Sequence, residues 1–302
     1  MSPAAAGRQA LAETGYRQAA RITRDNGTTY YWGTLLLPPE RRRHVYAVYA
    51  LCRMADDIVD APSATTPGSV ERTGAELEVF RERVGKAIAG EPTDEPIMAA
   101  IADSFARCDI PMENVDRFFG AMAQDLTQSS YETWDDLVAY MEGSAAVIGE
   151  MMLPVLKPLS RSAFGPARSL GFAFQLTNFL RDIGEDLDRG RVYVPQEDLR
   201  RFGADPWVRV VTPEWRELMR FEIARNRELY AQADAGIPML PSSSARCVGT
   251  ARELYARILE GIEQSDYDVF TGRVRVASWS KAMTSARVLA VGPRQRRKVG
   301  AR

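Results

Sequence analysis

The sequence predicts an all-α protein, because three observations agree. Apolar residues recur three and four apart along most of the chain, which is the spacing of one helix face. Sustained alternation of apolar and polar residues, the pattern of a half-buried strand, is almost absent. No repeat, low-complexity block or linker interrupts residues 1–302, so we expect one domain, with disordered tails at 1–15 and 290–302.

Clusters of proline, glycine and serine divide the periodic segments and so set the order of the helices. The clusters are LPPE at 37–40, APSATTPGS at 61–69, GEPTDEP at 90–96, DIP at 109–111, KPLSRSAFGP at 157–166, GADPW at 203–207 and GIPMLPSSS at 236–244. Helices are expected at about 8–24, 39–60, 72–89, 95–107, 112–128, 133–156, 161–187, 213–235, 243–265 and 276–289. Pro38 and Pro39 suit a first helical turn, and Thr133 and Ser162 are predicted N-caps.

Bulk composition excludes several classes of protein. A net charge of −1 gives no indication of nucleic-acid binding. Three scattered cysteines without zinc spacing suit a reduced cytoplasm, where we expect the protein. His44 is the single histidine, so a metal would need oxygen ligands. The chain does not open on a signal-peptide pattern, and no run approaches the roughly 20 apolar residues of a membrane span.

The basic end of the chain has two interpretations. From Arg287 onward it carries six cationic residues and no acid: Arg287, Arg294, Arg296, Arg297, Lys298 and Arg302. The first interpretation is a solvated tail. The second is attraction to an anionic membrane surface.

Two segments combine an acidic stripe with apolar flanks. In FQLTNFLRDIGEDLD, at 174–188, the polar residues lie three or four apart and share one helix face: Gln175, Asn178, Asp182, Glu185 and Asp186, with Arg181 beside them. In YAVYALCRMADDIVD, at 46–60, the same spacing joins Tyr49, Arg53, Asp56 and Asp60, with Asp57 one position off that face.

Carboxylates inside a bundle need positive partners, because burying an unpaired charge costs several kcal/mol. Oxygen ligands without imidazole favour Mg²⁺ or Mn²⁺, and Mg²⁺ usually shares its positions between one or two carboxylates, water and substrate phosphates. Two facing stripes therefore suggest a metal-bound diphosphate in a central cavity. The competing interpretation is that each stripe is a solvated helix face.

Diphosphate departure would leave a carbocation, which apolar walls must shield from water. Small residues in GSAAVIG at 143–149, including Ala145, would leave room for a long hydrocarbon, or would simply let helices pack closely. Four tyrosines near the stripes could face a cation through their rings: Tyr30, Tyr49, Tyr140 and Tyr267.

These segments resemble the phytoene/squalene synthase family. The similarity rests on CRMADDIVD, QLTNFLRDIGEDLDRGRVYVP, TLLLPPERR at 34–42, MAQDL at 122–126, YMEGSAAVIG at 140–149 and YDVF at 267–270, and it extends from about 20 to 285. Within the family the chain looks most similar to bacterial phytoene synthases. The resemblance implies a class I isoprenoid-synthase bundle and head-to-head condensation of two geranylgeranyl diphosphates through a cyclopropylcarbinyl diphosphate.

The resemblance also implies roles for individual residues. Metal ligands would be Asp56, Asp60, Asp182, Asp186, Asn178 and Glu185. Catalytic groups would be Tyr49, Arg53, Arg181, Tyr140 and Tyr267, and substrate contacts would be Gln175, Asn178, Arg191, Tyr30 and Ala145, with Arg189 able to close over phosphate.

Alternative activities are a squalene or dehydrosqualene synthase that uses farnesyl diphosphate, and a non-catalytic relative on the same scaffold. The expected cofactor is Mg²⁺ or Mn²⁺, without NADPH. The expected partners are a prenyl diphosphate, a membrane surface and a downstream carotenoid enzyme.

Overall fold

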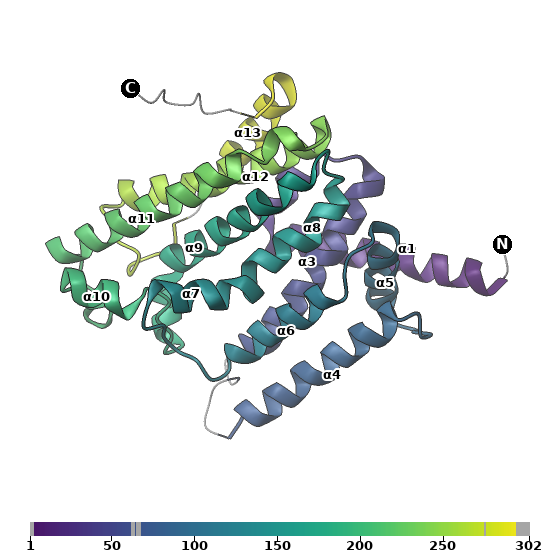
Figure 1. Cartoon of the computed structure of the whole chain (residues 1–302), viewed down its shortest axis with the longest axis horizontal. Coiled ribbons are helices and arrows are strands. Elements are labelled where there is room, and N and C mark those ends of the chain that lie inside the picture. Colours follow the sequence, from purple (N-terminus) through teal and green to yellow (C-terminus); the bar gives the residue numbers. More distant parts are fainter. Residues whose placement is uncertain (1–2, 62–63, 65–67, 275, 294–302) are drawn as a thin grey trace.

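The computed structural model describes residues 3–61, 64, 68–274 and 276–293 and is built from helices (Figure 1). The α-helices are α1 Pro3–Asn26, α2 Thr28–Thr34, α3 Pro39–Val59, α4 Val70–Ile88, α5 Pro96–Cys108, α6 Glu113–Gln124, α7 Trp134–Met141, α8 Val147–Leu156, α9 Phe164–Asp188, α10 Gln196–Phe202, α11 Pro213–Asp234, α12 Ser242–Gln264 and α13 Ser278–Val291. In the described residues, β-pairing is limited to an isolated bridge between Ser130 and Val192. The all-α prediction is confirmed.

The predicted helices agree closely with the observed ones, with a few corrections. The short helices α2 and α10 were not expected, because segments of seven residues carry too little periodicity to be recognised. Residues 3–15, expected as a disordered tail, belong to α1 instead. At the other end, residues 294–302 lie outside the described residues.

The predicted helix starts are confirmed at two of three sites. Thr133 caps α7 and forms a reciprocal capping box with Asp136. Pro38 precedes α3, whose first residue is Pro39. Ser162 is not a cap. Ser160 instead accepts a hydrogen bond from the Ser162 backbone N–H, at the start of the short 3₁₀ turn η2 (Arg161–Ala163) that leads into α9.

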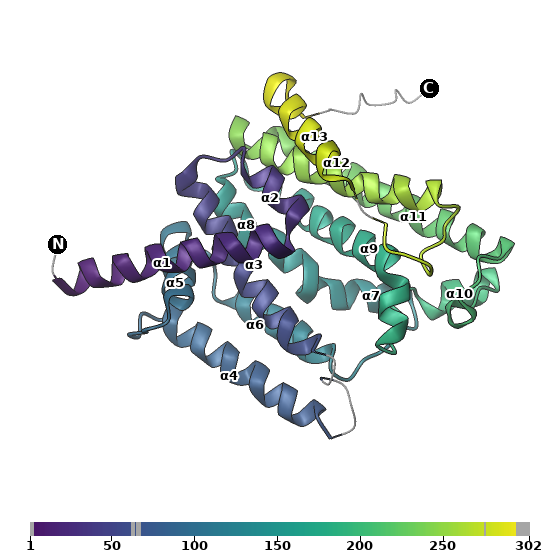
Figure 2. The same ribbon diagram turned by 180° about the vertical axis from the view of Figure 1, so that it is seen from behind.

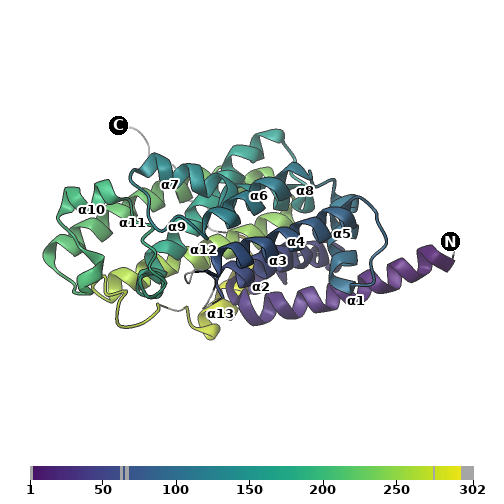
Figure 3. The same ribbon diagram turned by 90° about the horizontal axis from the view of Figure 1, so that it is seen from below.

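The helices pack in layers. Figure 3 shows α6, α7 and α8 on one side of the molecule and α1, α2 and α13 on the other, with α3, α9 and α12 between them. Seen from behind, α1 crosses α3, and α13 crosses α12 (Figure 2). One apolar core lies mainly among α1 and α3–α8, and a second lies mainly among α9, α11 and α12. In the part of the chain that the structure describes, no helix is both long and apolar enough to cross a membrane.

The neighbours of His44 indicate a structural role. Its Nδ1 lies 2.9 Å from the Ser104 hydroxyl and 3.0 Å from the Tyr16 hydroxyl, which donates to Asp103 at 2.8 Å. These groups join α1, α3 and α5. Burial lowers the pKa of His44, so the imidazole stays neutral and acts as a hydrogen-bonding partner inside the bundle.

The small residues of 143–149 allow close helix packing at the middle of the bundle. The segment Glu142–Ala146 is a π-helical turn, η1, between α7 and α8. A side-chain carbon added at Gly149 would lie 2.4 Å from the Ala167 carbonyl oxygen of α9. One added at Gly171 of α9 would lie 2.4 Å from the Ala145 carbonyl oxygen. Only glycine permits these two backbone contacts.

We expect Gly171→Ala to destabilise the protein by about 2 kcal/mol, since the new methyl group meets backbone that cannot move aside without distorting the helix pair. Gly120→Ala in α6 is the matched control. It adds the same methyl group at an exposed helical site with no atom within 4 Å, and it should stabilise by about 0.5–1 kcal/mol. Urea unfolding measures the change in the free energy of unfolding for both variants. Equal effects at the two sites would contradict the close-packing account.

Candidate functional site

A cavity of about 980 Å³ lies between the central helices. Its walls come from α2, α3, η1, α8, α9 and α12 and from the segment before α13. The volume is at the upper end of the range of small-molecule sites, about 300–1,000 Å³. The cavity is therefore large enough for a long ligand.

Both acidic stripes line this one cavity. From α3 come Tyr49, Arg53, Asp56 and Asp60. From α9 come Gln175, Asn178, Arg181, Asp182, Glu185 and Asp186. The helix-face argument from spacing is therefore correct for both segments, and neither stripe is a fully solvated surface.

Arginines join the two stripes at the C-terminal ends of α3 and α9. Arg189 Nη1 lies 3.7 Å from Asp60 Oδ2 and 3.8 Å from Asp186 Oδ1, so a single cation faces an acid of each stripe. Arg191 Nη1 lies 2.9 Å from Asp60 Oδ1, and its Nη2 donates to the carbonyl oxygens of Val59 and Asp125. The loop after α9 thus ties the two helix ends together.

A second set of ion pairs surrounds Asp182. Arg181 donates to both of its oxygens, at 2.7 and 2.5 Å. Arg273, from the segment before α13, lies 2.8 Å from Asp182 and 3.7 Å from Glu185. The polar end of the cavity therefore contains both acids and arginines, which is the composition needed to bind a phosphate group together with a cation.

The carboxylates are not fully compensated by these arginines. Burial and repulsion from Asp60 raise the pKa of Asp56 to about 7. Burial and repulsion from Asp182 raise the pKa of Asp186 to about 8, although Arg189 and Arg191 act in the opposite direction. Burial disfavours the ionised form of a carboxyl group, and nearby positive charge favours it. Bound divalent cations would supply such charge.

The ligand atoms at this end also suit a hard cation. The Asn178 side-chain oxygen is buried in the cavity wall and has no hydrogen-bond partner among the described residues. Acidic and amide oxygens are the ligands that Mg²⁺ takes. Within the described ranges, no three acidic, histidine or cysteine side chains are grouped to hold a metal unaided. Phosphate oxygens of a bound ligand would complete such a coordination shell.

Many other residues of the cavity wall are apolar or aromatic. Ile148, Met152, Leu170, Ile237, Leu240, Val248 and Ile258 line it. Tyr30, Tyr49, Phe174 and Tyr255 form a chain of ring contacts along its wall, with ring centroids 4.3–5.9 Å apart. Ala145 lines the wall as well. A charged head and an apolar tail would each find a matching surface.

Four lining residues of the site were not predicted from the stripes. Asp125 accepts a hydrogen bond from the Tyr140 hydroxyl at 2.7 Å and one from the Tyr193 hydroxyl at 3.4 Å, and burial raises its pKa to about 6. The others are Tyr193, Tyr255 and Arg273. The MAQDL and GRVYVP motifs could have pointed to Asp125 and Tyr193. Arg273 follows the YDVF motif at 267–270 by three residues, whereas Tyr255 lies outside the motifs.

One expected residue, Tyr267, is not in the cavity wall. Its ring lies under Arg220 at 5.3 Å, and its carbonyl oxygen accepts a hydrogen bond from Trp215 Nε1 at 3.0 Å. The backbone at Tyr267 is left-handed, with φ 64°, where the chain turns after α12. The side chain is partly buried and packs against the core among α9, α11 and α12. Asp57 also lies outside the wall, where it pairs with Arg53 at 2.5 Å.

Comparison with known proteins gives a consistent picture. A model of the squalene/phytoene synthase family matches residues 23–280. The 15-cis-phytoene synthase of Synechococcus elongatus is 36% identical over 281 residues, which cover 88% of this chain and 89% of that protein. The chloroplastic phytoene synthase of Daucus carota is 36% identical over 285 residues, covering 91% of this chain and 70% of that protein. Among solved structures, a dehydrosqualene synthase in complex with ligand superposes with a TM-score of 0.84 at 25% identity, covering 92% of this chain and 96% of that one.

Arg191 should matter for stability, because its side chain is buried and supports three acceptors at once. We expect Arg191→Met to lower the free energy of unfolding by about 2 kcal/mol, since two buried carbonyl oxygens lose their donor. Arg189→Met removes the same charge beside the same acid, but that side chain is 43% exposed, so the loss should stay below about 1 kcal/mol. Urea unfolding measures the loss in the free energy of unfolding for both variants. A larger loss for Arg189→Met would refute this ranking.

Proposed function

The chain belongs to the squalene/phytoene synthase family, and from that premise we propose that it is a phytoene synthase acting as one catalytic domain. In this reaction two molecules of geranylgeranyl diphosphate condense head to head. The observation that carries the proposal is the meeting of Asp60 and Asp186 at Arg189, at the polar end of a long apolar cavity.

Binding of the diphosphate groups is assigned to the polar end. Arg53, Arg181, Arg189, Arg191 and Arg273 would bind phosphate oxygens. Asp56, Asp60, Asp182 and Asp186 would hold Mg²⁺, with Asn178 and Glu185 beside them and Gln175 close to the substrate. Mg²⁺, when bound, would offset the negative charge that develops on the departing diphosphate.

The chemistry releases two diphosphates and two protons. In the first stage, the C–O bond of one substrate breaks and diphosphate leaves with the electron pair. The double bond of the second substrate attacks the resulting cation, and loss of a proton closes a cyclopropane ring. In the second stage, the remaining diphosphate leaves, the carbon skeleton rearranges and a second proton is lost. No electrons are supplied from outside, so we do not expect NADPH to be required.

The remaining cavity residues would control the fate of the cations. Apolar side chains such as Met152 and Leu170 keep water away from them. The rings of Tyr30, Tyr49 and Phe174 present π-faces that attract a cation. Tyr140, held by its hydrogen bond to Asp125, stacks with Phe179, and both rings line the cavity.

A second candidate is dehydrosqualene synthesis from the shorter farnesyl diphosphate. It is favoured by the TM-score of 0.84 to a dehydrosqualene synthase. The phytoene synthases are the more similar in sequence, at 36% against 25% identity. A non-catalytic role is disfavoured, because both acidic stripes remain in the cavity. In either reaction the hydrocarbon product would pass to a membrane or to an enzyme that consumes it.

Product identification tests the substrate. Purified protein is incubated with geranylgeranyl or farnesyl diphosphate and Mg²⁺, with and without NADPH, and extracts are analysed by mass spectrometry. We expect phytoene from geranylgeranyl diphosphate in both conditions and no product after chelation with EDTA, because the acids would lack their cations. A product formed only from farnesyl diphosphate would reject the proposed substrate.

Substitution of the stripe acids tests the site. Asp60→Asn and Asp182→Asn should each reduce diphosphate release by about 100-fold or more, since each removes a charge that holds the cation. Glu40→Gln is the matched control: this exposed acid lies on the same helix but outside the cavity wall, and turnover should remain within about threefold. Thermal unfolding checks that all variants are folded. Full turnover by Asp60→Asn would exclude the assigned role.

A further inference from the structure

A π-helical turn forms part of the cavity wall. The turn η1 joins α7 to α8, and its Ser144 and Ala145 line the cavity. Tyr140 before the turn and Ile148 after it line the same cavity. A π turn contains one residue more than the α-helical turn it replaces, which rotates one side of the helix by about 100° relative to the other. The turn therefore sets the register in which these side chains share one wall.

The conformation of this turn is unfavourable by itself. π turns are rare in proteins. The Ser144 hydroxyl is buried and has no hydrogen-bond partner among the described residues, which lowers stability. A side-chain carbon added at Gly143 would lie 2.8 Å from the Arg117 carbonyl oxygen of α6, so the backbone of the turn is in close contact with that helix. Such a conformation persists only where the surrounding structure holds it.

Four charged side chains hold the turn from outside the cavity. Arg168 of α9 forms ion pairs with Glu142, the first residue of the turn, and with Glu150 of α8. Arg117 of α6 pairs with the same two acids, at 2.5 Å from Glu150 Oε2 and 3.6 Å from Glu142 Oε2. All four side chains lie outside the cavity wall. The two arginines thus connect α6 and α9 to both ends of the turn.

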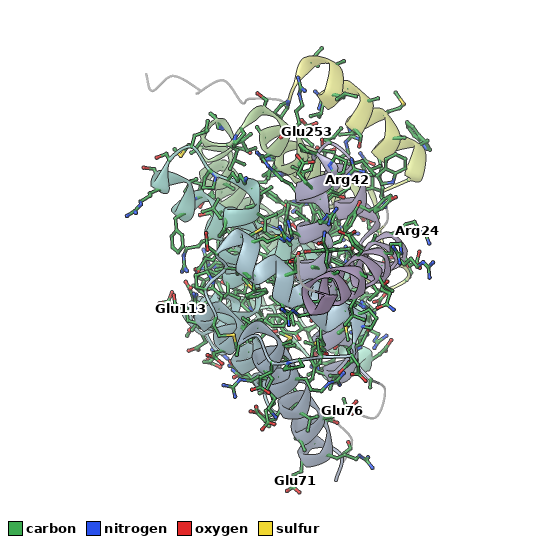
Figure 4. The ribbon with its side chains drawn as sticks, turned by 90° about the vertical axis from the view of Figure 1, so that its right-hand side faces the viewer. Arg24, Arg42, Glu71, Glu76, Glu113 and Glu253 are labelled. Carbon is green, nitrogen blue, oxygen red and sulfur yellow. The ribbon has the colours of Figure 1, made fainter. Side chains whose placement is uncertain are left out.

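Arg168 is the less exposed of the two arginines. Its side chain is 24% exposed, against 37% for Arg117, and their shared partner Glu150 is 5% exposed. Figure 4 labels Glu113, one turn before Arg117 in α6, at the outer edge of the molecule. Water therefore screens the ion pairs of Arg117 more than those of Arg168, and Arg168 should contribute more to fixing the turn.

We propose that Arg168 is a positioning residue, which holds η1 in its π-helical register through Glu142 and Glu150. It acts on the reaction through the cavity wall and does not touch the substrate. The consequence rests on the proposed function, in which the cyclopropylcarbinyl diphosphate must stay in the cavity until the second diphosphate leaves. Loss of the register misplaces Tyr140 relative to Ile148, and the intermediate is then released before it becomes hydrocarbon.

The partition of products tests this role. Wild type and Arg168→Met are incubated with Mg²⁺ and the prenyl diphosphate that wild type converts. Released intermediate is measured as its alcohol after phosphatase treatment, together with the hydrocarbon. We expect the ratio of intermediate to hydrocarbon to rise about tenfold or more in the variant. This ratio reports on the folded enzyme and does not depend on how much of the protein is folded.

Arg225→Met is the matched control. Arg225 is 18% exposed and also pairs with two buried acids, Asp198 and Glu222, but it lies outside the cavity wall and away from η1. Both substitutions remove an arginine from buried ion pairs and should lower stability. Only Arg168→Met should change the partition, and the ratio for Arg225→Met should stay within about twofold of wild type.

Hydrogen exchange tests the geometry without substrate. Amide exchange in peptides that cover residues 140–149 should become faster by about tenfold or more in Arg168→Met and stay unchanged in Arg225→Met. Glu142→Gln, at a side chain that is 36% exposed, is a milder variant and should move both measurements in the same direction. It decides the question if Arg168→Met does not fold.

Three results would overturn the proposal. The first is unchanged exchange at 140–149 in both Arg168→Met and Glu142→Gln. The second is faster exchange with an unchanged product ratio, which would limit Arg168 to stability. The third is an equal rise of the ratio in Arg168→Met and Arg225→Met. If wild type forms no hydrocarbon from geranylgeranyl or farnesyl diphosphate, the proposed function is rejected, and the exchange comparison still decides whether Arg168 fixes the turn.

Discussion

The structure depends on how carboxylates from two helices are kept close together inside a bundle. Asp56 and Asp60, at the C-terminal end of α3, line one cavity with Asp182 and Asp186 of α9, and like charges that lie close together repel each other strongly where water is scarce. Arginines from three places reduce this repulsion: Arg181 within α9, Arg189 and Arg191 in the following loop, and Arg273 before α13. The pKa values of Asp56 and Asp186, raised to about 7 and 8, indicate that the offset is incomplete. The site is thus poised to take up further positive charge.

The fold provides this arrangement through the packing of its middle layer. The C-terminal ends of α3 and α9 converge because the loop after α9 returns across both, with Arg191 bound to the end of α3 and to the Asp125 carbonyl after α6. Further from this end, Gly149 and Gly171 let α8 and α9 approach closely. Large side chains such as Phe174 and Met152 project into the space that remains. The same helices therefore provide both the polar end and the apolar body of the cavity.

The separation of a polar end from an apolar body in the cavity suits a reaction that creates charge at one end of an apolar molecule. On the proposed function, diphosphate would be stabilised where arginines and acids are concentrated, and the cation would be left among aromatic rings and aliphatic walls. Helix α13 contributes Lys281 to the cavity wall, and its Trp279, Met283 and Leu289 side chains are exposed.

By itself, the sequence determined the helical elements and the two stripes, since both follow from local spacing: residues three and four apart share a helix face wherever the helix lies. It also indicated that Asp56, Asp60, Asp182 and Asp186 would share a cavity. Tertiary structure alone decided the rest. Asp125, Tyr193, Tyr255 and Arg273 reach the site through contacts between distant segments, and Tyr267 lies outside the cavity wall. The outward orientation of the apolar face of α13 could not be predicted either. Periodicity shows that a helix has an apolar face, but the neighbouring helices decide whether that face is buried or exposed.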